Sequence, residues 1–145
     1  MRIVLQRVQR AAVEVDGQEL SRIGAGFLAL VCVARGDDAD VAQRAAQKVA
    51  GLRLFEDEAG KMNLDLAGVG GAVLVVSQFT LLADTSRGRR PSFEGAAPGD
   101  VAAPLVELFA ETLRLAGFAV ATGRFAAHMK IELVNDGPVT LVLDF

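Results

Sequence analysis

The chain has 145 residues and a net charge of −3, with 52% apolar and 23% charged residues. This length and composition suit one globular domain, so they argue against intrinsic disorder and leave little room for a second domain. They also exclude a protein that coats nucleic acid or an anionic membrane through overall positive charge. If the protein binds nucleic acid or another polyanion, a local basic patch would have to hold that ligand.

The chain contains one cysteine, Cys32, and one histidine, His128. These counts limit the disulfides and metal sites that it can form. A single cysteine cannot close an internal disulfide, and the two residues cannot build a zinc site from several Cys or His ligands. The apolar run 27–34 spans eight residues, whereas roughly 20 are needed to cross a bilayer. No signal peptide is visible. We therefore expect a cytoplasmic protein with no membrane association.

The first third of the chain predicts strands. Residues 2–8 alternate between two faces, and the strand pattern continues to Asp16-Gly17, a dipeptide suited to a tight hairpin. Residues 20–23 return from that hairpin. The continuous apolar run 27–34 then predicts a central strand that is covered on both faces.

The middle of the chain predicts a helix and a second buried strand. Three aspartates at positions 37, 38 and 40 indicate the N-cap and first turn of a helix over about 39–52. Its inward stripe would consist of Val41, Ala45, Val49 and Leu52. A short strand at 54–55 precedes an acidic turn at 56–60, and a buried strand is expected from 72 to 79.

The last third predicts one more helix and three strands. The segment 83–99 reads as irregular, polar and basic, and a helix is expected over about 101–116. The residues expected to face inward on this helix are Leu105, Leu108, Thr112 and Leu115. The expected strands are 118–122, 130–134 and 139–143, with a turn at 135–138 between the last two.

This order of elements predicts the fold class. A strand cluster, a helix, a strand, a second helix and further strands indicate one α/β domain over residues 1–145. The sheet would be mixed, with the two main helices packed on one side.

Three segments are the best candidates for function. The first candidate is the end of the second buried strand, where the residues become polar. Ligands of α/β sheets tend to bind at strand ends. The segment consists of Ser77, Gln78, Phe79, Thr80 and Leu81. An ordinary polar strand end is the alternative interpretation.

The second candidate is the loop 84–93, which carries three arginines in four positions, Arg87, Arg89 and Arg90. Such a cluster suits phosphate contacts, and the alternative is a solvated loop. The third is Asn135-Asp136-Gly137-Pro138, which could also be a turn and nothing more. His128 reads as a packed or surface histidine rather than a catalytic base.

These segments, with the opening Val4-Leu5-Gln6-Arg7-Val8, resemble the D-aminoacyl-tRNA deacylases, formerly called D-tyrosyl-tRNA deacylases. The resemblance runs from Met1 to about Asp144. Its motifs are GLRLFEDEAGKMN at 51–63, VSQFTL at 76–81, GRRPSF at 88–93, TGRFAAHM at 122–129 and NDGPVT at 135–140. SQFTL and NDGPVT in this order and spacing are highly specific to the family.

The resemblance implies an activity. The family hydrolyses the ester that joins a D-amino acid to the 3′-terminal adenosine of tRNA, and it also clears mischarged glycine. It works as a homodimer with no metal or organic cofactor, so the expected partners are aminoacylated tRNA and a second copy of the chain, with no DNA.

The resemblance also implies site residues. Ser77 to Leu81 would line the pocket together with Met129. Gly137 and Pro138, joined by a cis peptide bond in the family, would enter the partner subunit's pocket and exclude L side chains. Arg7 matches an arginine that supports this turn.

Ester hydrolysis needs donors that stabilise an oxyanion, and backbone N–H groups near Phe79 and Thr80 could provide them without a titrating side chain. Two routes to the nucleophile stay open. Thr80 could attack the ester, or water could attack with help from the 2′-OH of the substrate. The second route is favoured because the chain offers no base near Thr80 in sequence.

Two other functions compete with this one. A dimer that binds tRNA through Arg87, Arg89 and Arg90 without hydrolysis is the first, although mere binding would need neither SQFTL nor Gly137-Pro138. The second is a related deacylase type, which removes L-alanine misattached to a threonine tRNA and keeps its Gly-Pro turn in trans. Arg7 and SQFTL favour the D-specific type.

Overall fold

The computed structural model describes all residues from Met1 to Phe145. Its first strand, β1 (Arg2–Val15), is the centre of the fold. One edge of β1 pairs with β3 (Gly26–Cys32) and then with β2 (Gln18–Ile23), and the other edge pairs with β8 (Lys130–Asp144). All three pairings are antiparallel. The expected hairpin at Asp16-Gly17 joins β1 to β2 and is confirmed.

Beyond β3 the sheet becomes parallel. Strand β6 (Ala72–Ser77) pairs in parallel with β3, and β7 (Ala119–Thr122) pairs in parallel with β6. The order is β2-β1-β3-β6-β7, with β8 on the other edge of β1. The mixed sheet predicted from the sequence is therefore confirmed.

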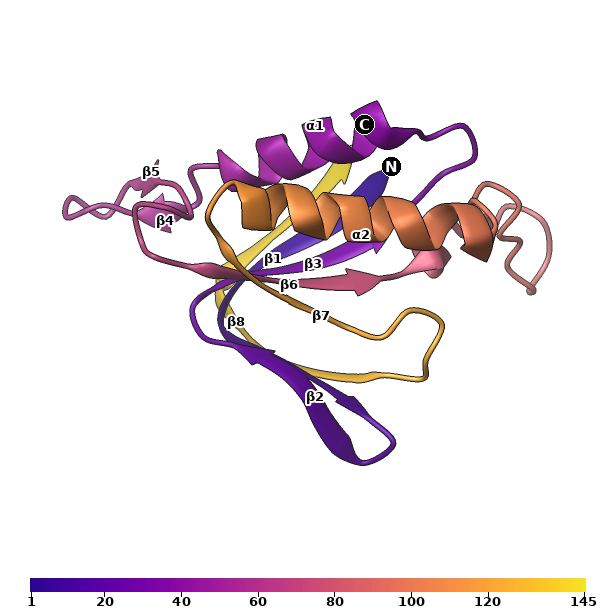
Figure 1. The fold of residues 1–145 in the computed structure, drawn as a ribbon, viewed down its shortest axis with the longest axis horizontal. Helices are drawn as coiled ribbons and strands as arrows, with labels where there is room; N and C mark the ends of the chain where they lie inside the picture. The colour runs from indigo at the N-terminus through magenta and orange to yellow at the C-terminus, as the bar shows by residue number, and fades with distance from the viewer.

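Both helices lie on the same face of the sheet, as expected (Figure 1). Helix α1 (Ala39–Ala50) begins at the N-cap Asp38, whose carboxylate accepts a hydrogen bond from the Val41 N–H at 3.0 Å. Helix α2 (Gly99–Leu115) packs beside it. The fold class, an α/β structure with two helices on one side, agrees with the prediction. The division of the chain into a single domain over residues 1–145 stays a prediction.

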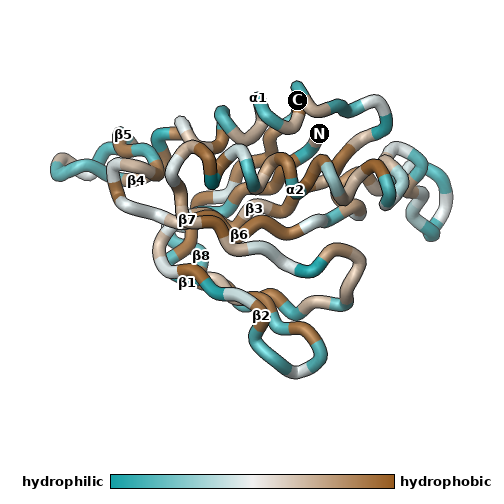
Figure 2. Tube along the Cα trace, viewed as in Figure 1, coloured by the Kyte–Doolittle hydropathy of each residue, from teal (hydrophilic) through white to brown (hydrophobic).

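The apolar core has two parts because the sheet curls. The larger part lies between the two helices and the face of the sheet that they cover, around Phe27, Ala45 and Phe109. The smaller part lies inside the curl formed by the far halves of β1 and β8 with β2, and includes Val13 and Leu74. Figure 2 shows hydrophobic residues concentrated along β3 and β6, and hydrophilic residues in the loop that precedes α2.

The turn predicted at 135–138 does not separate two strands. Both halves of β8 run antiparallel to β1 in the same direction, with Gln6 opposite Thr140 and Val8 opposite Asn135. Residues 136–139 therefore leave the ladder opposite a single β1 residue, Arg7, and then rejoin it. The turn-like sequence encodes an outward excursion within one strand.

The inward stripe predicted for α2 was confirmed in part, because Leu105 and Leu108 are half-buried and pack against the core, but the most deeply buried residues are others. The buried residues are Ala102, Phe109, Ala110 and Leu113, whereas Leu115 is 81% exposed. Both sets have helical spacing, and the large ring of Phe109 decides which of them faces the sheet. Pro104 lies in the second turn, on the exposed side of the helix.

Other boundaries differ by a few residues. Helix α1 ends at Ala50 rather than 52, so Leu52 packs against the core from outside the helix. The expected strand at 54–55 is β4 (Phe55–Glu56), and its partner β5 (Met62–Leu64) was not predicted. Strand β6 ends at Ser77 rather than 79. No helix in the structure has the length and apolar character needed to span a membrane.

The packing of α2 gives a prediction of stability. Phe109→Ala should lower the free energy of unfolding by about 3–5 kcal/mol, because it removes a fully buried ring and leaves a cavity. Leu115→Ala is the matched control and should change it by less than about 0.5 kcal/mol. Urea denaturation measures both. Equal losses would contradict the assigned stripe.

Candidate active site

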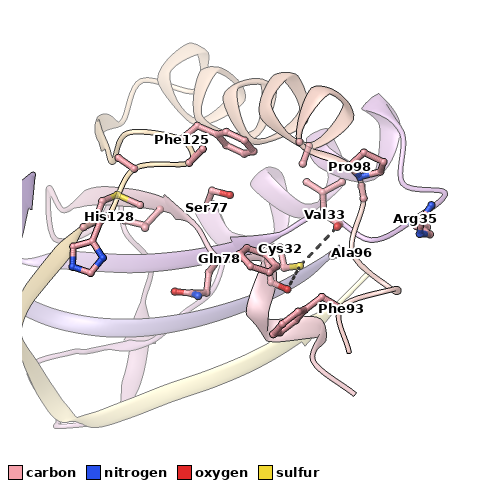
Figure 3. Close-up of a pocket in the computed structure, with 18 of the residues that line it drawn as sticks. Cys32, Val33, Arg35, Ser77, Gln78, Phe93, Ala96, Pro98, Phe125 and His128 are labelled. Atoms are coloured by element: carbon pink, nitrogen blue, oxygen red, sulfur yellow. Dashed lines mark hydrogen bonds between the residues drawn. The ribbon is translucent and has the colours of Figure 1, made fainter. Parts of the chain in front are cut away.

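A cavity of about 690 Å³ opens where β3 and β6 end and α2 begins. This volume lies within the range of about 300–1,000 Å³ typical of sites for small molecules. Four segments form its walls, namely the residues after β3, the end of β6, the segment leading into α2, and the chain between β7 and β8 (Figure 3). Its position at the carboxyl ends of two parallel strands is where α/β sheets bind ligands.

The end of β6 forms the wall with the most polar groups. The Gln78 N–H donates to the Val31 carbonyl at 2.8 Å, and the chain then turns into the short 3₁₀ helix η1 (Phe79–Leu82). The first turn bond of η1 runs from the Leu81 N–H to the Gln78 carbonyl at 3.3 Å, so the N–H groups of Phe79 and Thr80 come before it and have no acceptor within the helix. The side-chain amide of Gln78 donates to Thr80 Oγ1. Two backbone donors at the start of η1 therefore stand beside the cavity.

The wall opposite consists of the loop between β7 and β8, which carries Phe125, His128 and Met129. This loop is anchored to β6, because the Gly123 N–H donates to the Val75 carbonyl at 2.9 Å. A Cβ on Gly123 would lie only 2.7 Å from Met129 Sδ. Glycine at this position therefore lets the methionine side chain pack against the backbone and face the cavity.

Cys32 belongs to the floor of the cavity. Its thiol donates to the Phe79 carbonyl, with Sγ and the oxygen 3.4 Å apart (Figure 3). Burial raises the pKa of the thiol above its usual value, so the group is protonated near neutral pH. A protonated donor is a poor nucleophile, and the contact instead ties the end of β3 to η1.

The outer wall is held by backbone contacts between two loops. The Arg35 N–H donates to the Gly95 carbonyl at 2.9 Å, and the Ala97 N–H donates to the Val33 carbonyl at 2.9 Å. The Arg35 side chain donates from Nε to the Glu94 carbonyl at 2.6 Å. Sequence analysis missed Arg35, because a lone arginine after a strand carries no signal of its position.

The excursion 136–139 lies outside this cavity. Gly137 and Pro138 are exposed, and the bond between them is cis. Arg7, which is only 5% exposed, donates from Nε to the Asp136 carbonyl at 2.9 Å and from Nη1 to the Leu54 carbonyl at 2.5 Å. The Asn135 side chain accepts from the Val139 N–H at 2.9 Å. Two side chains therefore hold the excursion at both of its ends.

The structure thus brings together some of the expected residues and separates others. Ser77, Gln78 and Phe79 share the cavity with Met129. Thr80 and Leu81 lie next to it in η1. The remaining expected residues do not line it, and these are Arg7, Arg87, Arg89, Arg90, Gly137 and Pro138. Phe93 and Phe125 do line it, and both lie in motifs that the sequence analysis identified without naming either as a site residue.

The fold and the sequence are similar to those of known proteins. A family model described as D-Tyr-tRNA(Tyr) deacylase matches residues 4–144. A D-aminoacyl-tRNA deacylase of Thermomicrobium roseum is 62% identical over 144 residues, which cover 99% of this chain and 94% of that protein.

Two solved structures share the fold. A protein described as c-Myc DNA Unwinding Element Binding Protein has a TM-score of 0.93 and 36% identity, over 100% of this chain and 99% of that chain. A probable eukaryotic D-amino acid tRNA deacylase has a TM-score of 0.84 over 99% of this chain and 98% of that chain. Its identity is 19%, so this second likeness concerns the fold alone.

The mixed sheet, the cavity at its strand ends and the family model define a hydrolase of the class that acts on aminoacyl-tRNA esters. More particularly, the chain belongs to the D-Tyr-tRNA(Tyr) deacylase family, whose relatives carry the name D-aminoacyl-tRNA deacylase. The resemblance found in the sequence is confirmed, and so is the prediction that the chain is an enzyme of this class.

Proposed function

We propose that this chain hydrolyses the ester between a D-amino acid, or glycine, and the 3′-terminal adenosine of tRNA. The observation that carries the proposal is the pair of N–H groups of Phe79 and Thr80 at the start of η1, beside a cavity of suitable size. Such donors stabilise the oxyanion that forms when the ester carbonyl is attacked. Acting on D-aminoacyl-tRNA, the enzyme would proofread chirality during translation in the cytoplasm.

Water is the nucleophile in this proposal. Water attacks the ester carbonyl, its proton passes through the 2′-OH of the substrate to the 3′-oxygen, and the bond from the acyl carbon to that oxygen breaks, so that the tRNA leaves with a 3′-hydroxyl. Thr80 Oγ1 contacts the amide of Gln78, which donates a hydrogen bond and cannot take up a proton. No base in contact with Thr80 would activate its hydroxyl.

Selection for D-amino acids would come from the excursion 136–139 of a second copy. Gly137 and Pro138 are exposed and do not line the cavity of their own chain. A homodimer would place these residues in the partner's cavity, where backbone carbonyls hold the substrate ammonium group and the turn excludes L side chains. Backbone recognition accounts for tolerance of many D side chains, because it makes no contact with them.

Arg87, Arg89 and Arg90 would contact tRNA phosphates. All three are exposed, and none forms an ion pair in the structure. A guanidinium group with no carboxylate partner is free to bind phosphate through two hydrogen bonds.

The proposed activity is tested by single-turnover deacylation of D-tyrosyl-tRNA and L-tyrosyl-tRNA with a chelator present. We expect rapid loss of the D ester and none of the L ester. Glycyl-tRNA should also be cleaved. Loss of neither tyrosyl ester, with tRNA still bound, would favour a non-catalytic tRNA-binding protein. Selective cleavage of L-alanyl-tRNA would favour the related deacylase type.

The role of Thr80 is tested by Thr80→Ala. We expect kcat to fall by roughly tenfold or less, because one side-chain hydrogen bond contributes about 0.5–1.5 kcal/mol. Removal of a true nucleophile costs about 10⁴-fold or more. A loss of that size, with tRNA binding and the melting temperature unchanged, would identify Thr80 as the nucleophile.

The role of the excursion is tested by Gly137→Ala. Gly137 has a φ of +134°, and a Cβ there would lie 2.7 Å from Val139 Cγ2 and 3.2 Å from Arg7 Nη2. The turn must shift, and we expect the ratio of D to L hydrolysis to fall by roughly tenfold or more, since a misplacement of about 1 Å changes rates by about 10²-fold.

Gly60→Ala is the matched control for this substitution. Gly60 also has a positive φ, +73°, but a Cβ there would contact nothing within 4 Å. It carries a similar backbone strain without moving the excursion. Equal D to L ratios in the two variants would remove the excursion from chiral selection.

A further inference from the structure

Two aromatic rings lie together at the mouth of the cavity, on the surface of the protein. Phe79 of η1 and Phe93 of the following loop are 55% and 36% exposed. Their centroids are 5.0 Å apart and their planes meet at 73°, in an edge-to-face arrangement. Single exposed apolar side chains are common on protein surfaces, whereas two exposed rings in contact beside a cavity form a joint aromatic surface on which a ligand can pack.

Phe93 is held in place although its loop is exposed. Asp84 and Ser92 exchange two backbone hydrogen bonds, of 2.8 and 2.9 Å, which close the base of the loop just before Phe93. Arg35 donates a hydrogen bond to the carbonyl of Glu94, the residue that follows Phe93 in the chain. The ring is therefore positioned before any ligand binds, which lowers the entropy cost of binding.

The loop that positions Phe93 also carries groups that bind anions. These groups are the side chains of Arg87, Arg89 and Arg90, which are exposed and have no carboxylate partner. Aromatic rings next to free arginines are the typical surface for single-stranded nucleic acid, whose bases stack while its phosphates are neutralised.

The position of Phe93 suits a nucleic-acid strand that extends out of the cavity better than it suits a mononucleotide. Its side chain lines the cavity (Figure 3) and is 36% exposed. The proposed substrate ends in an aminoacyl-adenosine, which the cavity is large enough to enclose. The rest of the tRNA chain must then leave the cavity through its mouth.

We propose that Phe93, supported by Phe79, is the stacking platform for the base that precedes the terminal adenosine of the tRNA. The inference rests on the proposed function, since it takes the terminal aminoacyl-adenosine to occupy the cavity. It assigns to the loop a recognition of unpaired RNA bases, in addition to phosphate contacts. The enzyme would thereby distinguish an aminoacylated RNA end from a free aminoacyl-adenosine.

The first test compares two substrates, D-tyrosyl-tRNA and D-tyrosyl-adenosine. We expect Phe93→Leu to lower kcat/KM on the tRNA about tenfold more than on the adenosine ester, a difference of about 1.4 kcal/mol. Phe93→Tyr keeps an aromatic face and should restore most of the loss. Leu115→Ala removes an exposed side chain at the far end of α2 and should change neither value.

The second test removes the base itself. An abasic nucleotide replaces the one before the terminal adenosine, and its effect is measured in the wild type and in Phe93→Leu. We expect base removal to cost the wild type about tenfold and to cost the Phe93→Leu variant little, because both changes delete the same contact. Arg89→Ala, which removes a phosphate contact, should combine with base removal additively.

The outcomes separate this inference from the proposed function. If Phe93→Leu lowers activity equally on both substrates, or if its effect adds to that of base removal, the stacking role is wrong. Binding of uncharged tRNA, with and without the base, is measured in parallel and shows the same coupling if the inference holds. If the wild type cleaves neither ester, the proposed function fails, and the binding series alone decides the role of Phe93.

Discussion

The buried guanidinium group of Arg7 connects three parts of the chain that are distant in sequence. It donates to the carbonyls of Leu54 and Asp136, and the carboxylates of Glu56 and Asp136 lie 3.9 and 3.5 Å from its nitrogens. A buried cation is costly unless its donors are satisfied, so these partners must stay in place. The requirement fixes the segment before β4 and the start of the excursion 136–139 against β1. The shape of the exposed turn thus depends on a side chain that solvent barely reaches.

The candidate site relies on backbone groups more than on titrating side chains. Its donors are the N–H groups of Phe79 and Thr80, and Cys32 contributes a protonated thiol that contacts the Phe79 carbonyl. The backbone donors lie where β6 leaves the sheet and turns into η1. The position of that turn therefore matters more for the proposed chemistry than the identity of any single side chain. The proposed mechanism therefore needs no titrating side chain from a chain that has one histidine and one cysteine.

Several features could be predicted from the sequence, because local patterns encode them. The N-cap at Asp38, the hairpin at Asp16-Gly17 and the mixed sheet all agree with expectation. The stripe of α2 was predicted only in part because two sets of residues share helical spacing, and only contact with the sheet distinguishes Phe109 from Leu115. Arg35 was missed because its role arises from contact with Glu94, a residue far along the chain. The grouping of Ser77, Gln78 and Phe79 followed from the polar end of a buried strand, but the loop carrying Phe125 joins them only through the fold.

The excursion in β8 has a consequence for how such a protein can change over evolutionary time. Its residues leave the ladder after Asn135 and rejoin it at Thr140, and the pairs with β1 continue on both sides. A change within such a segment leaves the pairs of the flanking strand with β1 in place. The cavity is built from other parts of the chain, so such changes leave its walls intact. The exposed turn and the walls of the cavity can therefore change separately, within the limit that Arg7 sets by binding the Asp136 carbonyl.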